Sequence, residues 1–261
     1  MIKLIALDLD GTLINAEQKV SIRNREAIKK CIERGIMVSI HTGRCAASTI
    51  ETIKDLELKG YHASSSGALI IDKNLKFYHK KRMPEKFVRE LFLTCRELKI
   101  PFLGQTCDSF ISYEKRPQIF NYMDSEVFFN YIPDMTIDEV VQNTLQVTLI
   151  LSDDDPLNEY FKERFGQNLK LRRAGKMFVN IIDNSAGKLT GLKKVMEIAG
   201  LKREEIMSMG DTEVDLGIIN FAGTGVAMEN SPEVLKKAAD FVSTHCEEDG
   251  VAHAIERFIF N

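Results

Sequence analysis

A short apolar run at the N-terminus, which ends in two aspartates, constrains the fold of this chain more than any other feature. Residues 2–7 read IKLIAL, and Asp8-Leu9-Asp10-Gly11 follows directly. Such a run predicts a strand buried on both faces, as in a parallel sheet. In open α/β sheets, ligands bind just beyond the carboxyl ends of the strands, so Asp8 and Asp10 stand where such a fold does chemistry. The two carboxylates share one side if the chain stays extended; if it does not, Gly11 allows a sharp turn.

The next segments predict a helix and a second strand. Residues 21–34 have apolar positions at helical spacing after a serine N-cap, and residues 36–40 form another apolar run. This strand–helix–strand order predicts two parallel strands joined by a right-handed crossover. Thr42 and Gly43 then follow the second strand, where a hydroxyl and a backbone N–H can hold a phosphate oxygen. We expect the neighbouring His41 to be a packing or solvent-exposed residue rather than a base.

The C-terminal part of the chain repeats the α/β pattern. Lys188 begins a predicted helix, and a lysine there opposes the helix dipole, which favours a role other than helix stability. Residues 206–209 form a further apolar strand. Asp211 and Asp215 follow it, four residues apart, so that on a helix beginning there they would share one face. Polar groups from distant parts of the sequence are therefore predicted to converge at the carboxyl edge of one sheet.

The middle of the chain differs in composition from its two ends. The chain has 261 residues, of which 44% are hydrophobic, enough for one large or two modest domains. Between residues 81 and 183 lie 14 of its 21 aromatic residues, on segments that alternate between helical and strand patterns. We therefore predict a core formed by residues 1–80 and 184–261, with an inserted α+β domain at 81–183. The aromatic side chains there are expected to form that domain's own core.

Charge and cysteine content argue against several classes of protein. A net charge of −3 lacks the basic excess of a nucleic-acid-binding surface. Five widely spaced cysteines, an odd number, favour reduced thiols over disulfides or a zinc site. The N-terminus lacks the layout of a signal peptide, and no apolar run approaches the roughly 20 residues of a membrane helix. We expect a soluble cytoplasmic protein.

Taken in order, these motifs resemble those of the haloacid dehalogenase superfamily. The segments that carry the resemblance are DLDGTL at 8–13, TGR at 42–44, Lys188, GDTEVD at 210–215 and GVAM at 225–228. The last segment and the large insert are similar to the Cof-type branch, with a type IIB cap. The resemblance implies a Rossmann-like, doubly wound parallel sheet with an α+β cap. The cap would lie over the site and determine which substrate binds. The chain departs from the usual pattern at Ser66, Leu189 and Val214.

The resemblance also implies roles for the site residues. Asp8 would attack phosphorus and form an aspartyl-phosphate, and Asp10 would protonate the leaving oxygen and then activate water. The phosphoryl group would be held by Thr42, Gly43 and Lys188. Because several carboxylates repel a phosphate dianion, the site needs a cation, and oxygen ligands suit Mg²⁺. The expected metal-binding residues are Asp8, Asp10, Asp211 and Asp215.

The sequence leaves some alternatives open. Dehalogenases of the superfamily lack the second aspartate, so Asp10 favours hydrolysis of a phosphate monoester. A phosphomutase-like transferase and a non-catalytic protein that binds a phosphometabolite remain possible readings. The expected partner is a small phosphorylated metabolite, with a sugar phosphate favoured by the family, and neither nucleic acid nor membrane is expected. We expect a monomer or a weak homodimer.

Overall fold

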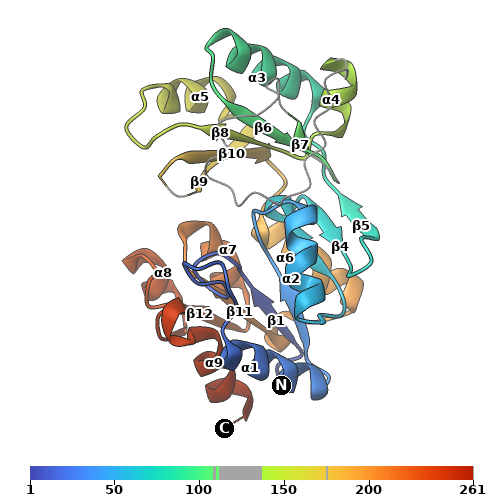
Figure 1. Cartoon of the computed structure of the whole chain (residues 1–261), viewed down its shortest axis with the longest axis vertical. Coiled ribbons are helices and arrows are strands. Elements are labelled where there is room, and N and C mark those ends of the chain that lie inside the picture. The colour runs from blue at the N-terminus through green and yellow to red at the C-terminus, as the bar shows by residue number, and fades with distance from the viewer. Residues whose placement is uncertain (108–109, 112–136, 175, 261) are drawn as a thin grey trace.

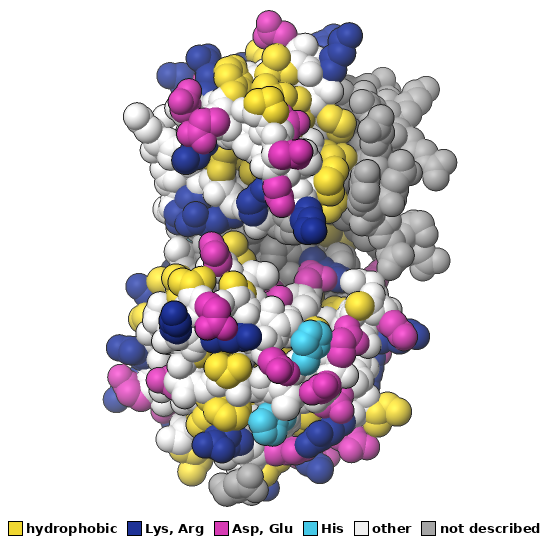
Figure 2. Space-filling model, turned by 90° about the vertical axis from the view of Figure 1, so that its left-hand side faces the viewer, with side chains coloured by type: hydrophobic (Ala, Val, Ile, Leu, Met, Phe, Trp, Pro, Cys, Tyr) yellow, Lys and Arg dark blue, Asp and Glu magenta, His cyan; other side chains and the backbone are white. Residues whose placement is uncertain are grey.

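The computed structural model shows two lobes, a core that carries both chain termini at its far end and a cap (Figure 1). It describes residues 1–107, 110–111, 137–174 and 176–260. The space-filling view in Figure 2 shows acidic and basic side chains interspersed over the face of both lobes. No helix within the described ranges is long and apolar enough to cross a membrane.

The core lobe is built on a five-stranded parallel sheet in the order β13-β12-β11-β1-β2. Strand β1, Leu4–Leu7, lies between β11, Ile206–Gly210, and β2, Met37–Ile40, and all of its residues are buried. Alternate residues of β1 enter the two hydrophobic clusters on opposite faces of the sheet, as expected for a strand covered by helices on both sides. The doubly wound α/β fold predicted from the sequence is confirmed.

Helices cover both faces of this sheet (Figure 1). The first, α1, spans Ile22–Glu33 and connects β1 to β2; Ser21 caps it by accepting a hydrogen bond from the backbone N–H of Asn24. A small antiparallel sheet, β3-β4-β5, leads toward the cap. The remaining core elements are α2 Ala46–Asp55, β3 His62–Ser64, β4 Leu69–Ile71, β5 Phe77–Lys80, α6 Lys188–Ala199, α7 Leu216–Phe221, β12 Thr224–Ala227, α8 Glu233–Ala238, β13 Phe241–Val242 and α9 Gly250–Ile255.

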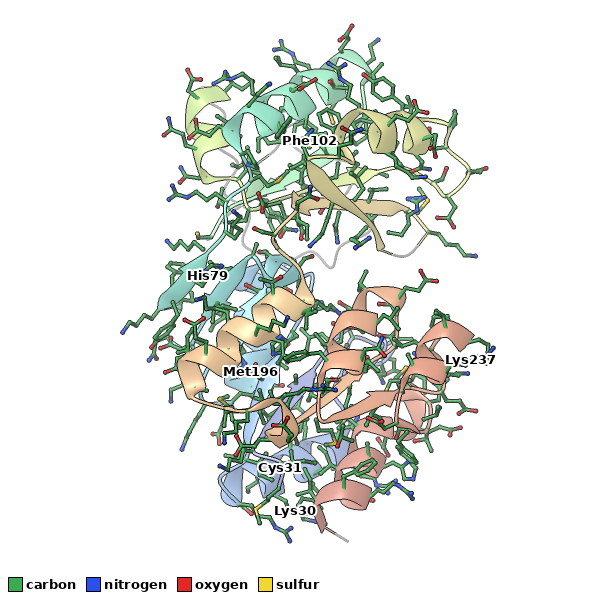
Figure 3. The ribbon with its side chains drawn as sticks, turned by 180° about the vertical axis from the view of Figure 1, so that it is seen from behind. Lys30, Cys31, His79, Phe102, Met196 and Lys237 are labelled. Atoms are coloured by element: carbon green, nitrogen blue, oxygen red, sulfur yellow. The ribbon has the colours of Figure 1, made fainter. Side chains whose placement is uncertain are left out.

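The cap is a second sheet with helices on one side. Its five strands pair antiparallel in the order β7-β6-β8-β10-β9, and its helices lie on the side away from the core (Figures 1 and 3). These elements are α3 Glu85–Glu97, β6 Phe102–Gln105, β7 Phe110–Ile111, α4 Ile137–Asn143, β8 Gln146–Ile150, α5 Leu157–Phe165, β9 Leu169–Ala174 and β10 Phe178–Asp183. The chain returns to the core where β10 leads into α6. The exact domain boundaries stay a prediction.

Aromatic side chains fill the interior of the cap, as the sequence predicted for them. The rings of Phe92 and Phe102 lie 4.7 Å apart, and those of Phe161 and Phe165 lie 5.9 Å apart, all four buried. Phe102 is labelled in Figure 3, where it lies in the cap lobe. The aromatic residues at positions 113–131 lie outside the described residues.

Candidate active site

Three buried carboxylates converge at the carboxyl edge of the core sheet. Asp8 follows β1 and Asp211 follows β11, its parallel neighbour, while Asp215 comes from the turn before α7. Each of the three offers an oxygen, and these oxygens all lie within 4.8 Å of one another. Carboxylate oxygens at this spacing are a ligand set suited to a divalent cation.

Lys188 provides positive charge at this cluster. Its Nζ lies 2.7 Å from Oδ1 of Asp8 and 2.7 Å from Oδ1 of Asp215, and its side chain is only 6% exposed. Because Lys188 is the first residue of α6, its ammonium stands at a helix end that disfavours positive charge, and the two carboxylates offset this. Lys188 thus lies beside aspartates from two distant segments, residues 8–13 and 210–215, as the sequence predicted.

Burial and repulsion among the carboxylates shift the pKa values of the cluster. Burial raises the pKa of Asp8 well above its usual range, with Asp215 and Asp211 adding to the rise, although Lys188 opposes it. Burial and Asp215 together raise the pKa of Asp211 to about 6. Burial lowers the pKa of Lys188, but Asp215 and Asp8 outweigh it and the net change is upward. One ammonium among three carboxylates leaves a deficit of positive charge that a divalent cation would meet.

The turn that carries Asp215 differs from the predicted helix start. Helix α7 begins only at Leu216, and a short 3₁₀ turn at Glu213–Asp215 precedes it. The turn forms because Oδ2 of Asp215 accepts hydrogen bonds from the backbone N–H and the hydroxyl of Thr212, at 3.2 and 3.1 Å. Both carboxylate oxygens of Asp215 are thus engaged, one by Lys188 and the other by Thr212.

Asp10 lies apart from the three buried carboxylates. Its carboxylate is exposed and is held by the guanidinium of Arg44, whose Nε donates to Oδ2 at 2.9 Å and whose second nitrogen donates to Oδ1. The chain does not stay extended after β1, because Gly11 turns it with a φ of +74°. A Cβ at Gly11 would collide with the carboxylate of Asp211, which accepts a hydrogen bond from the Thr12 hydroxyl at 2.9 Å.

Thr42 and Gly43 lie at the end of β2, beside the end of β1. The backbone N–H of His41 donates to the carbonyl of Leu7 at 2.7 Å, which aligns the two strand ends. Thr42 is buried, and its hydroxyl accepts a hydrogen bond from the backbone N–H of Arg44 at 3.1 Å. Two of the three residues predicted to hold phosphate therefore lie within two positions of Arg44, which binds Asp10.

A left-handed turn at residues 65–67 braces this loop, and sequence reasoning missed it. Ser65, Ser66 and Gly67 all have positive φ, at 48°, 55° and 82°. The backbone N–H of Ser66 donates to the carbonyl of Thr42 at 3.0 Å, so the turn supports the loop at residues 42–44. A Cβ at Gly67 would collide with the carbonyl of Gly187, next to Lys188. Strained conformations of this kind persist where surrounding contacts determine them, as they do here.

The cap meets the core at the same loop. The Ser66 hydroxyl donates to Oε1 of Gln146 in β8 at 2.7 Å, and Nε2 of Gln146 lies 3.4 Å from the carbonyl of Gly43. Ser66 is one of the positions where the sequence departs from the usual family pattern. No sequence signal pairs positions 66 and 146, since they belong to different lobes.

His41 is a buried packing residue, one of the two roles that the sequence predicted. Its Nε2 lies 3.0 Å from the Ser39 hydroxyl, and burial lowers its pKa from 6.5 to about 3. Because the unfolded chain protonates His41 below pH 6.5 and the folded chain does not, this residue's contribution to stability is lost as the pH falls toward 3. The free energy of unfolding of wild type should drop relative to that of His41→Gln by about 2 kcal/mol between pH 7 and 5. Urea denaturation of both proteins at both pH values measures this; parallel changes would show that folded His41 takes up a proton.

The chain is similar to known proteins over nearly its whole length. A family model described as haloacid dehalogenase-like hydrolase matches residues 5–255. The 5-amino-6-(5-phospho-D-ribitylamino)uracil phosphatase YcsE of Bacillus subtilis is 31% identical over 99% of this chain and 96% of its own length. A protein from Thermotoga maritima, whose crystal structure is known, is 27% identical in sequence. The match covers 99% of this chain and 98% of that one, with a TM-score of 0.87. A phosphatase of the same superfamily from Bacteroides thetaiotaomicron shares 27% identity with a TM-score of 0.83, over 99% of this chain and 95% of that one.

The family match agrees with the geometry, in which four residues from the resembling segments form one buried cluster: Asp8, Lys188, Asp211 and Asp215. The chain therefore belongs to the haloacid dehalogenase-like hydrolases, as a Cof-type phosphatase.

Proposed function

We propose that the protein is a Mg²⁺-dependent phosphatase that hydrolyses a small phosphorylated metabolite through an aspartyl-phosphate on Asp8. The observation that carries the proposal is the buried Asp8 carboxylate at the end of β1, which contacts Lys188 and lies within 4.8 Å of two further carboxylates. A carboxylate so placed is held against a cation rather than solvated, and carboxylates are known covalent nucleophiles in phosphoryl transfer.

The reaction would take place in two steps at Asp8. In the first, a carboxylate oxygen of Asp8 forms a bond to phosphorus while the bond to the leaving oxygen breaks, and Asp10 donates a proton to that oxygen. In the second, Asp10 takes a proton from water, whose oxygen attacks phosphorus and releases Asp8. Lys188, the Thr42 hydroxyl and the backbone N–H of Gly43 would hold the phosphoryl oxygens and stabilise their growing charge.

The carboxylates present fit a divalent cation. We propose Asp8, Asp10, Asp211 and Asp215 as the residues that hold Mg²⁺, which when bound supplies charge neutralisation for the substrate dianion. Asp8 and Asp211 would be the inner members. Asp215 is committed to Lys188 and Thr212, and the Asp10 carboxylate to Arg44, so these two would contribute from outside or through water.

Phosphate release from a generic aryl phosphate tests the proposal directly. Chelation should abolish activity and Mg²⁺ should restore it, whereas excess Ca²⁺ should inhibit because its looser coordination misplaces the nucleophile. Mg²⁺ should also raise the melting temperature of wild type but not of Asp211→Asn, since binding to the folded state stabilises it. Full turnover in metal-free buffer would refute the metal requirement. Phosphoryl transfer to a second sugar would favour a mutase, and binding without turnover would favour a non-catalytic protein.

Asp10 is expected to serve both as acid and as base. In Asp10→Asn, phosphorylation of Asp8 should slow by about 10²–10⁴-fold for a sugar phosphate but little for nitrophenyl phosphate, whose leaving group needs no proton. Because both substrates give the same phosphoenzyme, rapid mixing with nitrophenyl phosphate should show a burst followed by a slow steady rate. Arg44→Gln is the control that removes the ion pair and leaves the carboxyl group. An equal loss for both leaving groups without a burst would restrict Asp10 to holding the metal.

The substrate proposed is a phosphorylated sugar or a related compound. The name of the Bacillus subtilis relative, a phosphatase for a ribityl phosphate, supports a substrate of this class. A panel of metabolite phosphates, with that compound included, would identify it. We further propose that the protein acts in the cytoplasm as a monomer or weak homodimer, without nucleic acid or membrane partners. Its five cysteines, all among the described residues, form no disulfide, which supports a reducing compartment.

A further inference from the structure

We infer that four uncharged polar side chains of the cap, Gln105, Gln146, Thr148 and Asn180, form a polar patch that binds the leaving group and selects one rich in hydroxyls. This inference rests on the proposed phosphatase function. It assigns substrate choice to these four residues because of their position and because Gln105 has an unpaired polar atom.

The strand register places the four side chains on one face of the cap sheet. Gln105 lies directly opposite Gln146 on the neighbouring strand, and Thr148 lies opposite Asn180. Their sequence neighbours, such as Val147, point to the other face and enter the hydrophobic core under the cap helices. Since the helices cover the side away from the core lobe, the polar patch faces the core (Figure 1).

The polar patch touches the loop proposed to hold phosphate. Gln146 bridges the Ser66 hydroxyl, at 2.7 Å, and the Gly43 carbonyl, at 3.4 Å. A Cβ added to Gly43 would lie 3.6 Å from Nδ2 of Asn180, whose Oδ1 accepts a hydrogen bond from the Thr148 hydroxyl at 2.8 Å. A group attached to a phosphate at Thr42 and Gly43 would therefore extend along this patch.

Gln105 carries an acceptor that lacks a partner. Gln105 is only 6% exposed, yet its Oε1 has no hydrogen-bond partner among the residues that the structure describes. Buried polar atoms are normally paired, and each unpaired one needs an explanation. An amide oxygen accepts from a hydroxyl, so a ligand hydroxyl placed opposite Gln105 would satisfy it.

The same side chains favour a leaving group with hydroxyls over an apolar one. Amides and a hydroxyl can both donate to and accept from sugar hydroxyls, whereas an apolar group would offer no donor to the unpaired Oε1 of Gln105. A site built to hydrogen-bond hydroxyls rejects analogues that lack them far more strongly than an apolar pocket rejects an additional hydroxyl.

Substrate pairs that differ in hydroxyl content test the inference. Wild type should hydrolyse sorbitol 6-phosphate with a kcat/KM at least about 100-fold higher than that for hexyl phosphate. Gln105→Leu, which is close in size, should lower kcat/KM for sorbitol 6-phosphate about 10- to 100-fold and change that for phenyl phosphate less than about 3-fold. Gln167→Leu makes the same change at an exposed position of the cap and should leave both values unchanged.

The outcomes separate this inference from the proposed function. An equal loss for sorbitol 6-phosphate and phenyl phosphate in Gln105→Leu would overturn the inference, as would a wild type that does not prefer sorbitol 6-phosphate to hexyl phosphate. Failure to hydrolyse any substrate, phenyl phosphate included, would overturn the proposed function instead. In that case a rise in melting temperature with sorbitol 6-phosphate, present in wild type and lost in Gln105→Leu, would still support the polar patch, and no rise in wild type would refute it.

Discussion

Replacing Asp8 with asparagine should reduce phosphate release by about 10⁴-fold or more while the protein stays folded. The amide has nearly the same size as the carboxylate, and its oxygen can still accept a hydrogen bond from Lys188. It is a poor nucleophile, however, so no aspartyl-phosphate can form. Released phosphate, together with mass spectrometry of the acid-quenched enzyme, measures both effects: wild type should show a phosphorylated fraction and the variant none.

A surface aspartate provides the matched control for Asp8. Asp55 pairs with Arg25 at 2.6 Å, and both of these side chains are well exposed, so Asp55→Asn should retain full activity. Turnover of Asp8→Asn close to that of wild type would exclude Asp8 as the nucleophile. Loss of turnover with the phosphorylated fraction intact would assign the covalent step to another residue.

Lys188→Met should lower the free energy of unfolding by about 3–5 kcal/mol, besides abolishing activity. Methionine keeps the volume of the lysine stem, but Asp8 and Asp215 then lose their shared countercharge in a buried site. Removing one partner of a buried ion pair leaves an uncompensated charge, which costs more than the pair itself contributes. Urea denaturation in metal-free buffer measures the loss.

A second substitution separates charge from packing at Lys188. Adding Asp215→Asn to Lys188→Met should recover part of the lost stability, because one unpaired carboxylate is removed, so the two substitutions should be non-additive. Lys194→Met, on the same helix but paired with exposed Glu197, should change the free energy of unfolding by less than about 0.5 kcal/mol. A Lys188→Met protein as stable as wild type would show that the lysine does not neutralise the cluster.

The sequence predicted the parts of the fold that depend on local pattern. The apolar runs at residues 2–7, 36–40 and 206–209 became β1, β2 and β11, because a strand buried on both faces needs apolar residues throughout. The carboxyl ends of parallel strands meet at one edge of the sheet. Four residues that follow a strand or begin a helix therefore converge there, as predicted: Asp8, Lys188, Asp211 and Asp215.

The rest depended on contacts between residues far apart in the chain. Asp10 lies apart from the buried carboxylates because Gly11 turns the chain and because Arg44, 34 residues further on, holds its carboxylate. The left-handed conformations of Ser65 and Ser66 had no signal, since serine does not favour positive φ as glycine does. The Ser66–Gln146 hydrogen bond crosses from core to cap, and no local pattern can specify such a pairing.

The way the cap rejoins the core has a mechanical consequence. Strand β10 ends at Asp183 and the helix carrying Lys188 begins shortly after it, so the cap is attached to the lysine through a short peptide. A second tether fixes this peptide, because Nζ of Lys170 in β9 donates to the carbonyl of Ala186 at 2.7 Å. A rotation of the cap would therefore displace the backbone beside the Lys188 ammonium, which contacts Asp8. The orientation of the cap and the position of this buried charge are thus mechanically coupled.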